Sequence, residues 1–303
     1  MTPAPTKPIR RYTIGTAQFE PNSLEPGLYI VATPIGNLGD ITIRALATLA
    51  AADVILCEDT RNTAKLLDRY AIRTRLFAYH EHNAEKVRPG ILARLKENAA
   101  MALVSDAGMP LVSDPGYRLV VEAHAQGIAV TCCPGPSAVF TGLALSGLPT
   151  DRFGFFGFVP QKHGERSRIF AELASLKSTL IFFESPHRIV ETLHDLAIAL
   201  PDRAVVVARE LTKLHEEVLR GQALDIAATL AARPSVKGEI TLLVGPPDGK
   251  PEAVPQDVID TAIAGALQSM PASKAASDIA RRFNLNRKDV YARILAAKGN
   301  ANG

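Results

Sequence analysis

Short apolar runs alternate with helix-like segments over the first half of the chain. The runs that look like buried strands span residues 28–32, 54–57, 76–79, 102–105 and 128–132. Helix-like segments lie between them, for example at 41–51 and 87–98. Regular alternation of this kind favours right-handed βαβ units on a largely parallel sheet. We therefore predict an α/β domain over residues 27–149.

The stretch "SGLPTDRFGFFGFVP" breaks this rhythm with glycines, prolines and aromatic residues, which places a domain boundary near residue 150. Strand-like runs then follow at 153–159, 179–183, 204–208, 216–219 and 239–244, and helix-like segments at 166–176, 188–199 and 225–231. Few helices separate the last three runs, which indicates a mixed sheet. We predict a second α/β domain over residues 150–247.

The C-terminal tail concentrates positive charge. A proline-rich linker is predicted over 248–256 and a basic helical module over 257–303. The module should contain two short helices, the first ending near Arg282 and the second capped by Asn286. Its basic residues include Lys274, Arg281, Arg282, Arg287, Lys288 and Arg293. A helix-turn-helix-like module that contacts nucleic-acid phosphates and a helical hairpin with a solvated surface both fit this composition.

Composition excludes several classes of protein. With 47% hydrophobic and 21% charged residues, the chain has the balance of a soluble globular protein without a membrane span. Residues 1–26 lack the apolar core of a signal peptide, and we expect a disordered leader and a cytoplasmic protein. The cysteines Cys57, Cys132 and Cys133 are expected to be buried and reduced. Zinc-ligand spacings, a nucleophile elbow and a P-loop lysine are all missing, so no metal site is expected.

Four loops that follow strands of the first domain carry candidate chemistry, because ligands of open α/β sheets bind outside the carboxyl ends of the strands. The loop "TPIGNLGD" has two glycines but no dinucleotide fingerprint, and "CEDTRNT" presents an acidic cluster. That cluster fits an ordinary helix N-terminus better than a ribose-binding site. The loop "VSDAGMPLVSDPGY" is longer than a connection requires, and "PGPS" opens a small-residue helix whose free N–H groups can bind a ligand.

The second domain adds two charged clusters at strand ends, "FFESPHR" and "RELTKLHEE". Charge clustered in this way is produced both by ion-pair networks that stabilise a fold and by catalytic groups. The residues alone leave both interpretations open.

The motifs "TPIGNLGDIT", "CEDTRNT", "SDAGMPLVSDPG", "PGPSA", "FFESPHR", "RELTKLHEE" and "GEITLLVG" occur in one order. In this combination the chain resembles the ribosomal RNA small-subunit methyltransferase I family of the tetrapyrrole-methylase superfamily. The resemblance covers roughly residues 27–245, and the basic tail matches the family's usual extension. It implies two α/β domains of the tetrapyrrole-methylase type and S-adenosylmethionine as the methyl donor in the cleft between them.

The resemblance also implies site residues. The expected cofactor-binding positions are Pro34, Gly36, Asn37, Asp106, Ala107, Gly108, Leu111, Ser113, Pro134, Gly135, Ser137, Gly238 and Glu239. The implied substrate is a decoding-region cytidine, cytidine 1402, of 16S ribosomal RNA in the small ribosomal subunit. A homodimer is also implied.

The implied reaction is attack of a ribose 2′-oxygen on the methyl group of a sulfonium. Alignment supplies much of the rate, and the hydroxyl needs a positioned base. The candidate bases are Asp59, Asp106, Glu184 and Glu210, and the candidate cations are Arg61, Arg188, Arg209 and Lys213. The six basic tail residues named above are expected to bind RNA. A small-molecule methyltransferase of the same fold and a non-catalytic nucleic-acid-binding regulator are the alternatives.

Overall fold

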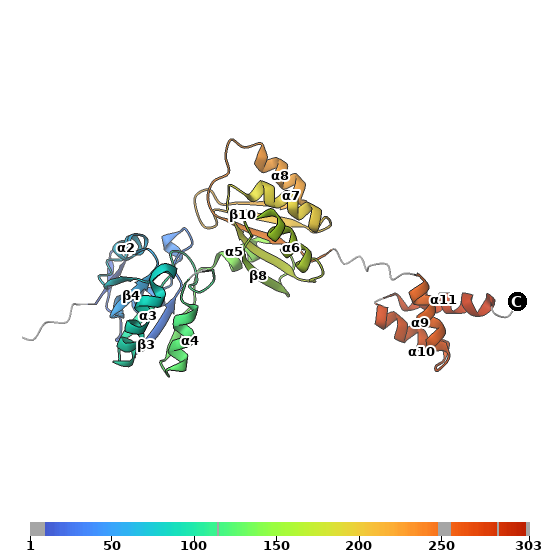
Figure 1. Cartoon of the computed structure of the whole chain (residues 1–303), viewed down its shortest axis with the longest axis horizontal. Coiled ribbons are helices and arrows are strands. Elements are labelled where there is room, and N and C mark those ends of the chain that lie inside the picture. Colours follow the sequence, from blue (N-terminus) through green and yellow to red (C-terminus); the bar gives the residue numbers. More distant parts are fainter. Residues whose placement is uncertain (1–9, 114, 248–255, 284, 301–303) are drawn as a thin grey trace, which may run out of the picture. The chain divides into compact units, whose positions relative to one another are not determined.

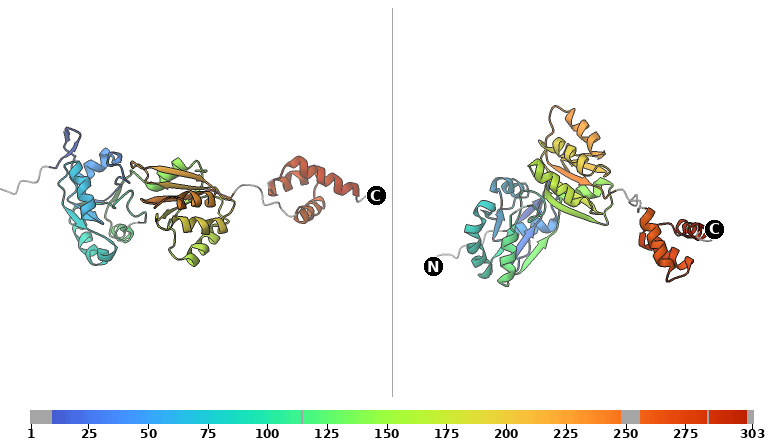
Figure 2. Two further views of the ribbon diagram at one scale, coloured as in Figure 1. Left: turned by 90° about the horizontal axis from the view of Figure 1, so that it is seen from above. Right: turned by 45° about the vertical axis from the view of Figure 1, so that its right-hand side comes forward.

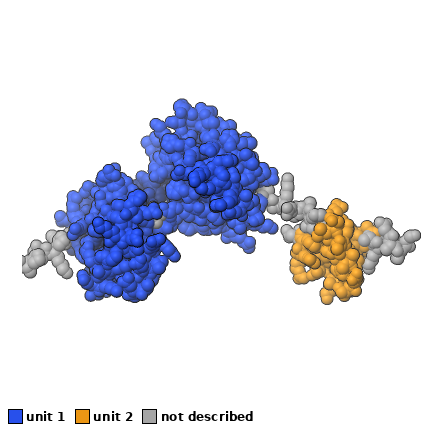
Figure 3. Space-filling view, in the orientation of Figure 1, with its two compact units in different colours: residues 1–247 blue, residues 248–303 orange. Residues whose placement is uncertain are grey.

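The computed structural model describes residues 10–113, 115–247, 256–283 and 285–300, with side chains to residue 296. It consists of two compact units, residues 1–247 and 248–303 (Figure 3). No helix among the described residues is both long and apolar enough to cross a membrane.

The first sheet is entirely parallel, as predicted. Its strands are β3 (Gly27–Val31), β4 (Val54–Cys57), β5 (Leu76–Ala78), β6 (Ala100–Leu103) and β7 (Val130–Cys133), in the order β5-β4-β6-β3-β7. Strand β6 begins and ends two residues before the predicted run. Val104 and Ser105 are buried but lie beyond the end of the strand, so the buried run in the sequence extends past β6.

Helices cover both faces of this sheet. One face carries α1 (Ile43–Ala51) and α2 (Thr60–Arg69), and the other carries α3 (Glu81–Lys96) and α4 (Tyr117–Ala125) (Figure 1). A 3-10 turn, η1 (Leu38–Asp40), precedes α1. Helix α3 starts six residues before the predicted segment, because its first turns are polar and carry no apolar period. Thr42 and Asp59 cap α1 and α2, and α2 starts within three residues of the end of β4.

The second sheet is mixed, as predicted. It contains β8 (Phe153–Phe158), β9 (Thr179–Glu184), β10 (Val205–Arg209), β11 (Glu217–Gly221) and β12 (Ile240–Val244), in the order β11-β10-β12-β9-β8. Only β8 and β9 pair in parallel. Helices α6 (His163–Leu173), α7 (Ile189–Ala199) and α8 (Ala223–Ala231) pack on one face.

Helix α5 (Ala138–Ser146) packs on the other face of the second sheet, although it follows the last strand of the first sheet (Figure 1). Its Val139 and Leu143 pack in a cluster with Ile181 and Leu243. The chain therefore crosses from one half of the first unit to the other before residue 138, and α5 belongs to the core of the second half.

The prediction of a disordered leader is wrong for residues 12–19. They form a hairpin of β1 (Tyr12–Ile14) and β2 (Ala17–Phe19). Thr13 N–H donates to Tyr70 O at 2.8 Å, and buried Tyr12 stacks on Phe19 at 5.4 Å. Two three-residue strands give too little alternation for a pattern to indicate them. Residues 1–9 lie outside the described residues.

The cysteine prediction is also wrong at one position. Cys57 and Cys133 are buried, but Cys132 is exposed. Neighbouring residues of a strand face opposite sides, and on the edge strand β7 the side that carries Cys132 is left open.

The described residues of the second unit form three helices, drawn in orange to red in Figure 2. Its helices are α9 (Gln256–Leu267), α10 (Ala272–Phe283) and α11 (Arg287–Asn300). Two of them were predicted, and Asn286 accepts the N–H of Lys288 at 2.9 Å as expected of the cap. Helix α9 was not predicted as a separate helix. Its Ile259 and Ile263 pack against Ile279 and Ile294, so the module has a core of its own.

Candidate active site

A cavity of about 390 Å³ opens between the two halves of the first unit. Its lining comes from the first half (Ile35, Asp106, Ala107, Gly108, Val112, Ser113) and from the second half (Ala138, Phe158, Phe183, Glu184, Ser185, Pro186, Leu211, Gly238, Glu239, Ile240, Thr241). Its size and mostly apolar walls with a few polar groups are typical of a small-molecule site.

Strand ends bring these segments together. In the first half, the loops after β3 and β6 meet in a two-residue bridge in which Thr33 and Gly108 exchange backbone hydrogen bonds of 2.9 and 3.0 Å. In the second half, the register pairs Ile240 with Glu184, so the start of β12 adjoins the end of β9. The cavity thus lies at the carboxyl edge of the first sheet, where the strand order predicts a ligand site.

The loop after β6 forms the cavity wall of the first half. Asp106, Ala107, Gly108 and Ser113 line the cavity, whereas Leu111 packs on the core beneath it. Leu111 and Ser113 have φ angles of 74° and 65°, a left-handed conformation that is costly for residues with a Cβ. Tertiary packing therefore holds this loop in one strained shape, as is common in ligand-binding loops.

The opening loop serves a different purpose from the one expected. Of residues 34–37 only Ile35 lines the cavity, and Pro34, Gly36 and Asn37 lie outside it. A Cβ on Gly36 would lie 2.4 Å from Cγ of Lys213, and Asn37 N–H donates to Oγ1 of Thr212 at 3.2 Å. The glycine makes room for the lysine stem of the other half, not for a ligand.

The "PGPS" loop lies beside the cavity. Only Ala138, the residue after Ser137, lines it. A Cβ on Gly135 would lie 3.0 Å from Cβ of Ala32, so this glycine permits close passage of the chain over β3. Pro134, Gly135 and Ser137 therefore position the start of α5 next to the cavity.

Glu184 and Arg188 form a buried anchor. The Glu184 side chain is fully buried and accepts from Thr192 Oγ1 at 2.5 Å, Ser185 N–H at 2.6 Å and Arg188 Nη2 at 2.6 Å. With both carboxylate oxygens engaged and Arg188 as its partner, Glu184 holds the 185–188 loop in place.

Glu210 and Lys213 form a second anchor next to the cavity. Lys213 Nζ lies 2.7 Å from Glu210 Oε1 and 3.1 Å from Glu239 Oε2. The hydrogen bond from Lys213 lowers the pKa of Glu210. Burial opposes the charge on Lys213, but hydrogen bonds to Glu210 and Glu239 outweigh it and raise the pKa of Lys213. A Cβ on Gly238, at φ 91°, would lie 2.4 Å from the Glu210 side chain. Lys213 therefore stays protonated, and Glu210 is a poor base.

Arg209 belongs to an ion-pair network. It bonds Glu217 at 3.1 Å, and Arg233 bonds the same carboxylate at 2.6 Å. Hydrogen bonds from Arg233 and then Arg209 hold the pKa of Glu217 at about 2. The geometry assigns Arg209 to fixing the β10–β11 hairpin.

Asp59 caps α2 and accepts two hydrogen bonds from the Arg61 guanidinium. Nε donates to Oδ1 at 3.1 Å, and Nη2 donates to Oδ2 at 2.7 Å. The Arg61 side chain and N–H hold the pKa of Asp59 at about 2. Asp106 accepts from Asp59 N–H at 3.1 Å and from Asn62 Nδ2 at 3.0 Å. Asp106 thus connects the start of α2 to the cavity that it lines, and it has no cation bonded to it in the described residues.

The apolar wall escaped the sequence analysis. Ile35, Val112, Phe158, Phe183 and Leu211 line the cavity but were not predicted. The aromatic run "FGFFGFV" was the available signal, yet aromatic residues at strand spacing mark an ordinary core equally well. No cluster of three His, Cys, Asp or Glu side chains suited to a metal ion occurs within the described part of the chain.

The family model for Tetrapyrrole (Corrin/Porphyrin) Methylases matches residues 27–227. A protein of Mesorhizobium japonicum named Ribosomal RNA small subunit methyltransferase I is 49% identical over 286 residues, which cover 94% of this chain and 97% of that protein. A protein of the same name from Erythrobacter litoralis is 50% identical over 276 residues, or 91% and 96% of the two chains. The chain belongs to the ribosomal RNA small subunit methyltransferase I family. The resemblance inferred from the motifs is confirmed.

Solved structures share the fold of this methyltransferase family. Cobalt precorrin-4 methyltransferase has a TM-score of 0.54 at 21% identity, covering 72% of this chain and 94% of that one. Uroporphyrin-III C-methyltransferase from Thermus thermophilus, complexed with S-adenosyl homocysteine, has a TM-score of 0.50 at 20% identity, covering 72% and 97%. A model for the RsmI C-terminal HTH domain matches residues 252–298. The predicted fold class is confirmed.

Lys213→Met tests the second anchor of this family member. Folding lowers the pKa of Glu210 and raises that of Lys213. The ion pair therefore contributes its full stabilisation of the native state at neutral pH. The carboxylate contribution is present above the pKa of Glu210 in the unfolded chain and is lost as pH falls through the lower native pKa. We expect the variant to lose about 1 kcal/mol of unfolding free energy at pH 7, with the difference shrinking in acid.

Denaturant titrations from neutral pH to about pH 2 measure this difference. Lys177→Met, at an exposed lysine, is the matched control and should stay within about 0.5 kcal/mol of wild type. A Lys213→Met deficit that is constant over this pH range would contradict the assigned ion pair.

Proposed function

We propose that this protein transfers the methyl group of S-adenosylmethionine to the ribose 2′-oxygen of a decoding-region cytidine in 16S ribosomal RNA. The observation that carries the proposal is the cavity between the two halves, built from the loops that hold the family's motifs. Relatives that match over nine tenths of the chain are named for ribosomal RNA methylation. A ribosomal substrate would also place the protein in the cytoplasm.

The residues of the cavity fit S-adenosylmethionine. Its apolar walls, including Ile35, Leu211 and Ile240, suit the flat adenine ring, and the strained loop at Ser113 offers backbone groups for polar atoms. The carboxylates of Asp106 and Glu239 in its lining complement the positive charge of a sulfonium. When bound, the cofactor supplies an electrophilic methyl group on a sulfur that leaves as a neutral thioether.

Asp106 is the proposed base. Glu184 is fully buried and paired with Arg188, Asp59 has a pKa of about 2, and Lys213 holds Glu210 ionised. Asp106 lines the cavity, and its carboxylate is oriented by the hydrogen bonds that it accepts from Asp59 N–H and Asn62 Nδ2 at the start of α2. In the proposed mechanism Asp106 accepts the proton of the 2′-hydroxyl while the walls of the cavity exclude water.

Methyl transfer from labelled S-adenosylmethionine to undermethylated small ribosomal subunits tests the function. We expect label on a ribose 2′-oxygen, and we expect Asp106→Asn to lower the transfer rate about 100-fold or more with cofactor affinity within a few-fold of wild type. Glu172→Gln, at an exposed carboxylate on α6, is the matched control and should transfer normally.

The outcomes separate the hypotheses. Well-folded wild-type protein that transfers no methyl group to ribosomal RNA would reject the function, and transfer to a tetrapyrrole alone would favour a small-molecule enzyme. RNA binding without any transfer would favour a nucleic-acid-binding regulator. Full activity of Asp106→Asn would reject Asp106 as the base and leave the function intact.

The C-terminal module is proposed to bind RNA phosphates, although its basic residues differ in availability. Arg293 bonds both oxygens of Asp260, at 2.8 and 2.9 Å, and joins α11 to α9. Arg287 donates to Oγ of Ser273 at 3.2 Å, which joins the start of α11 to the start of α10. Lys274 and Lys288 lie at the same two helix starts. Arg281 pairs with Asp278, and Arg282 lies over the ring of Phe283.

Deleting residues 248–303 tests this assignment. The module has its own core, so its removal should leave the first unit folded. We expect weaker RNA binding with a shallower salt dependence, and unchanged affinity for S-adenosylmethionine in calorimetric titrations. Equal loss of both affinities would contradict the division of labour.

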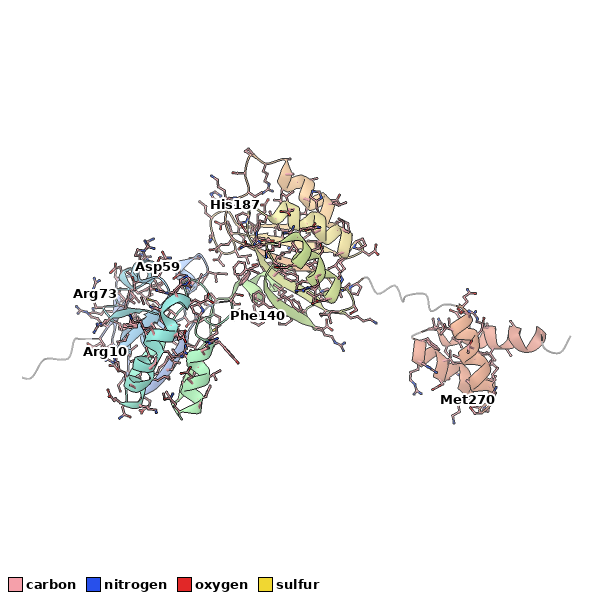
Figure 4. The ribbon with its side chains drawn as sticks, viewed as in Figure 1. Arg10, Asp59, Arg73, Phe140, His187 and Met270 are labelled. Atoms are coloured by element: carbon pink, nitrogen blue, oxygen red, sulfur yellow. The ribbon has the colours of Figure 1, made fainter. Side chains whose placement is uncertain are left out.

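A homodimer is proposed as the assembly. Phe140 on α5, labelled in Figure 4, is 62% exposed, and its ring meets that of Phe153 on the edge strand β8 edge to face at 5.7 Å between centroids. Exposed aromatic pairs beside an open sheet edge are suited to burial against a second copy. Sedimentation of the wild type as a monomer at micromolar concentration would reject this assembly.

A further inference from the structure

Helix α2 carries a row of basic residues on its solvent face. Arg61, Lys65 and Arg69 follow one another at intervals of four, and all three are exposed. Residues four apart in a helix lie on the same face, and the opposite face of α2 buries Leu66 and Leu67 in the core. From Arg61 to Arg69 the row extends over about 12 Å along the helix axis.

The row begins at the candidate active site. Asp106, which lines the cavity, accepts hydrogen bonds from Asp59 and Asn62 at the start of α2. Arg61, the first basic residue of the row, is 86% exposed, so its guanidinium is accessible from solvent even though it pairs with Asp59.

The row ends at a second, smaller cavity. This hollow of about 190 Å³ contains four arginines in its lining, Arg10, Arg11, Arg73 and Arg75. Ala71, just after the end of α2, belongs to the same lining. The N-terminal hairpin brings the first two arginines there, since Thr13 N–H is bonded to Tyr70 O. Figure 4 labels Arg10 and Arg73 near this end of the row and Asp59 near the other.

Positive charge is in excess along the whole surface. Its seven basic residues face three acidic partners, Asp53, Asp59 and Asp68, each already paired with an arginine. With Asp106 at the start of the row counted as well, three positive charges remain in excess, as many as the net charge of +3 of the entire chain. Among the described residues, Lys65, Arg69 and Arg75 have no carboxylate within 4.0 Å. Their cationic groups are free to bind an anion.

We propose that α2 and the four-arginine cavity form a track that binds the phosphate backbone of ribosomal RNA and leads it to the candidate active site. The proposal rests on the proposed function for the identity of the RNA. Guanidinium groups bind phosphate through two parallel N–H···O bonds, and a row of cations follows a polyanion without reading its bases. The track lies on the first unit and is separate from the C-terminal module.

Charge reversal at the far end of the track tests the proposal in the full-length protein. Arg73→Glu with Arg75→Glu should weaken binding of a 16S ribosomal RNA fragment about tenfold or more. The slope of log affinity against log salt should fall by about 0.7 to 0.9 for each phosphate that the variant no longer binds. Calorimetric affinity for S-adenosylmethionine should not change, because neither residue lines the cofactor cavity.

Two further variants make the result interpretable. Lys65→Glu with Arg69→Glu reverses charge nearer the active site and should also weaken RNA binding and lower its salt slope. Arg168→Glu with Lys177→Glu makes the same charge change at exposed positions of the second half and should bind RNA as wild type does. Thermal melts check that each variant is folded.

Wild-type RNA affinity and salt slope in both track variants would overturn the proposal. If the track variants no longer bound phosphatidylserine–phosphatidylcholine vesicles but still bound RNA as wild type does, the proposal would be overturned in favour of a lipid surface. RNA binding is measured without methyl transfer, so an inactive wild type would reject the proposed function separately. Normal transfer together with unaltered RNA binding in both variants would reject the track alone.

Discussion

The contact between the opening loop of the first half and the 210–213 loop of the second half determines the shape of the cavity. Ile35 packs with Ile181, Val206 and Leu243 in one apolar cluster, and the stem of Lys213 occupies the space that a Cβ on residue 36 would need. Close-packed contacts of this kind resist change by even one methylene group. The cavity is therefore held open by packing around it, and a side chain at position 36 would change the spacing of both halves.

Charged groups around the cavity divide into two kinds. Glu184, Glu210 and Glu217 are each bonded to a cation from the second half, and their ion pairs fix the loops that surround the cavity. Asp106 is bonded only to neutral N–H donors of α2 in the described structure. The ion pairs therefore provide rigidity, and Asp106 is left as the carboxylate proposed to act as the base.

The sequence predicted the architecture better than it predicted the roles of individual side chains. Strand–helix alternation and buried apolar runs identify the parallel and mixed sheets, since both patterns arise from local burial. The position of Asp106 after a strand also placed it correctly at the cavity. In contrast, a glycine that admits a ligand and one that admits a lysine stem have the same signature, so the role of Gly36 required the tertiary structure.

A single sequence also does not show which charged side chains pair with one another. Glu184 and Asp106 both follow strands in conspicuous motifs, yet Glu184 is bonded to a cation and Asp106 accepts only from neutral donors in the described residues. The hairpin at residues 12–19 escaped because each of its strands has only three residues, and Cys132 because an edge strand leaves one side open. These features depend on neighbours that are distant in sequence.

The path of α5 decides how this chain can be divided. The boundary that composition suggests, near residue 150, would leave α5 in the first fragment, although Val139 and Leu143 cover the second sheet. A fragment that begins at residue 150 would expose Ile181 and Leu243 to water and lack one layer of its core. The two halves are consecutive in sequence but share an interlocked core, so neither is an exchangeable module.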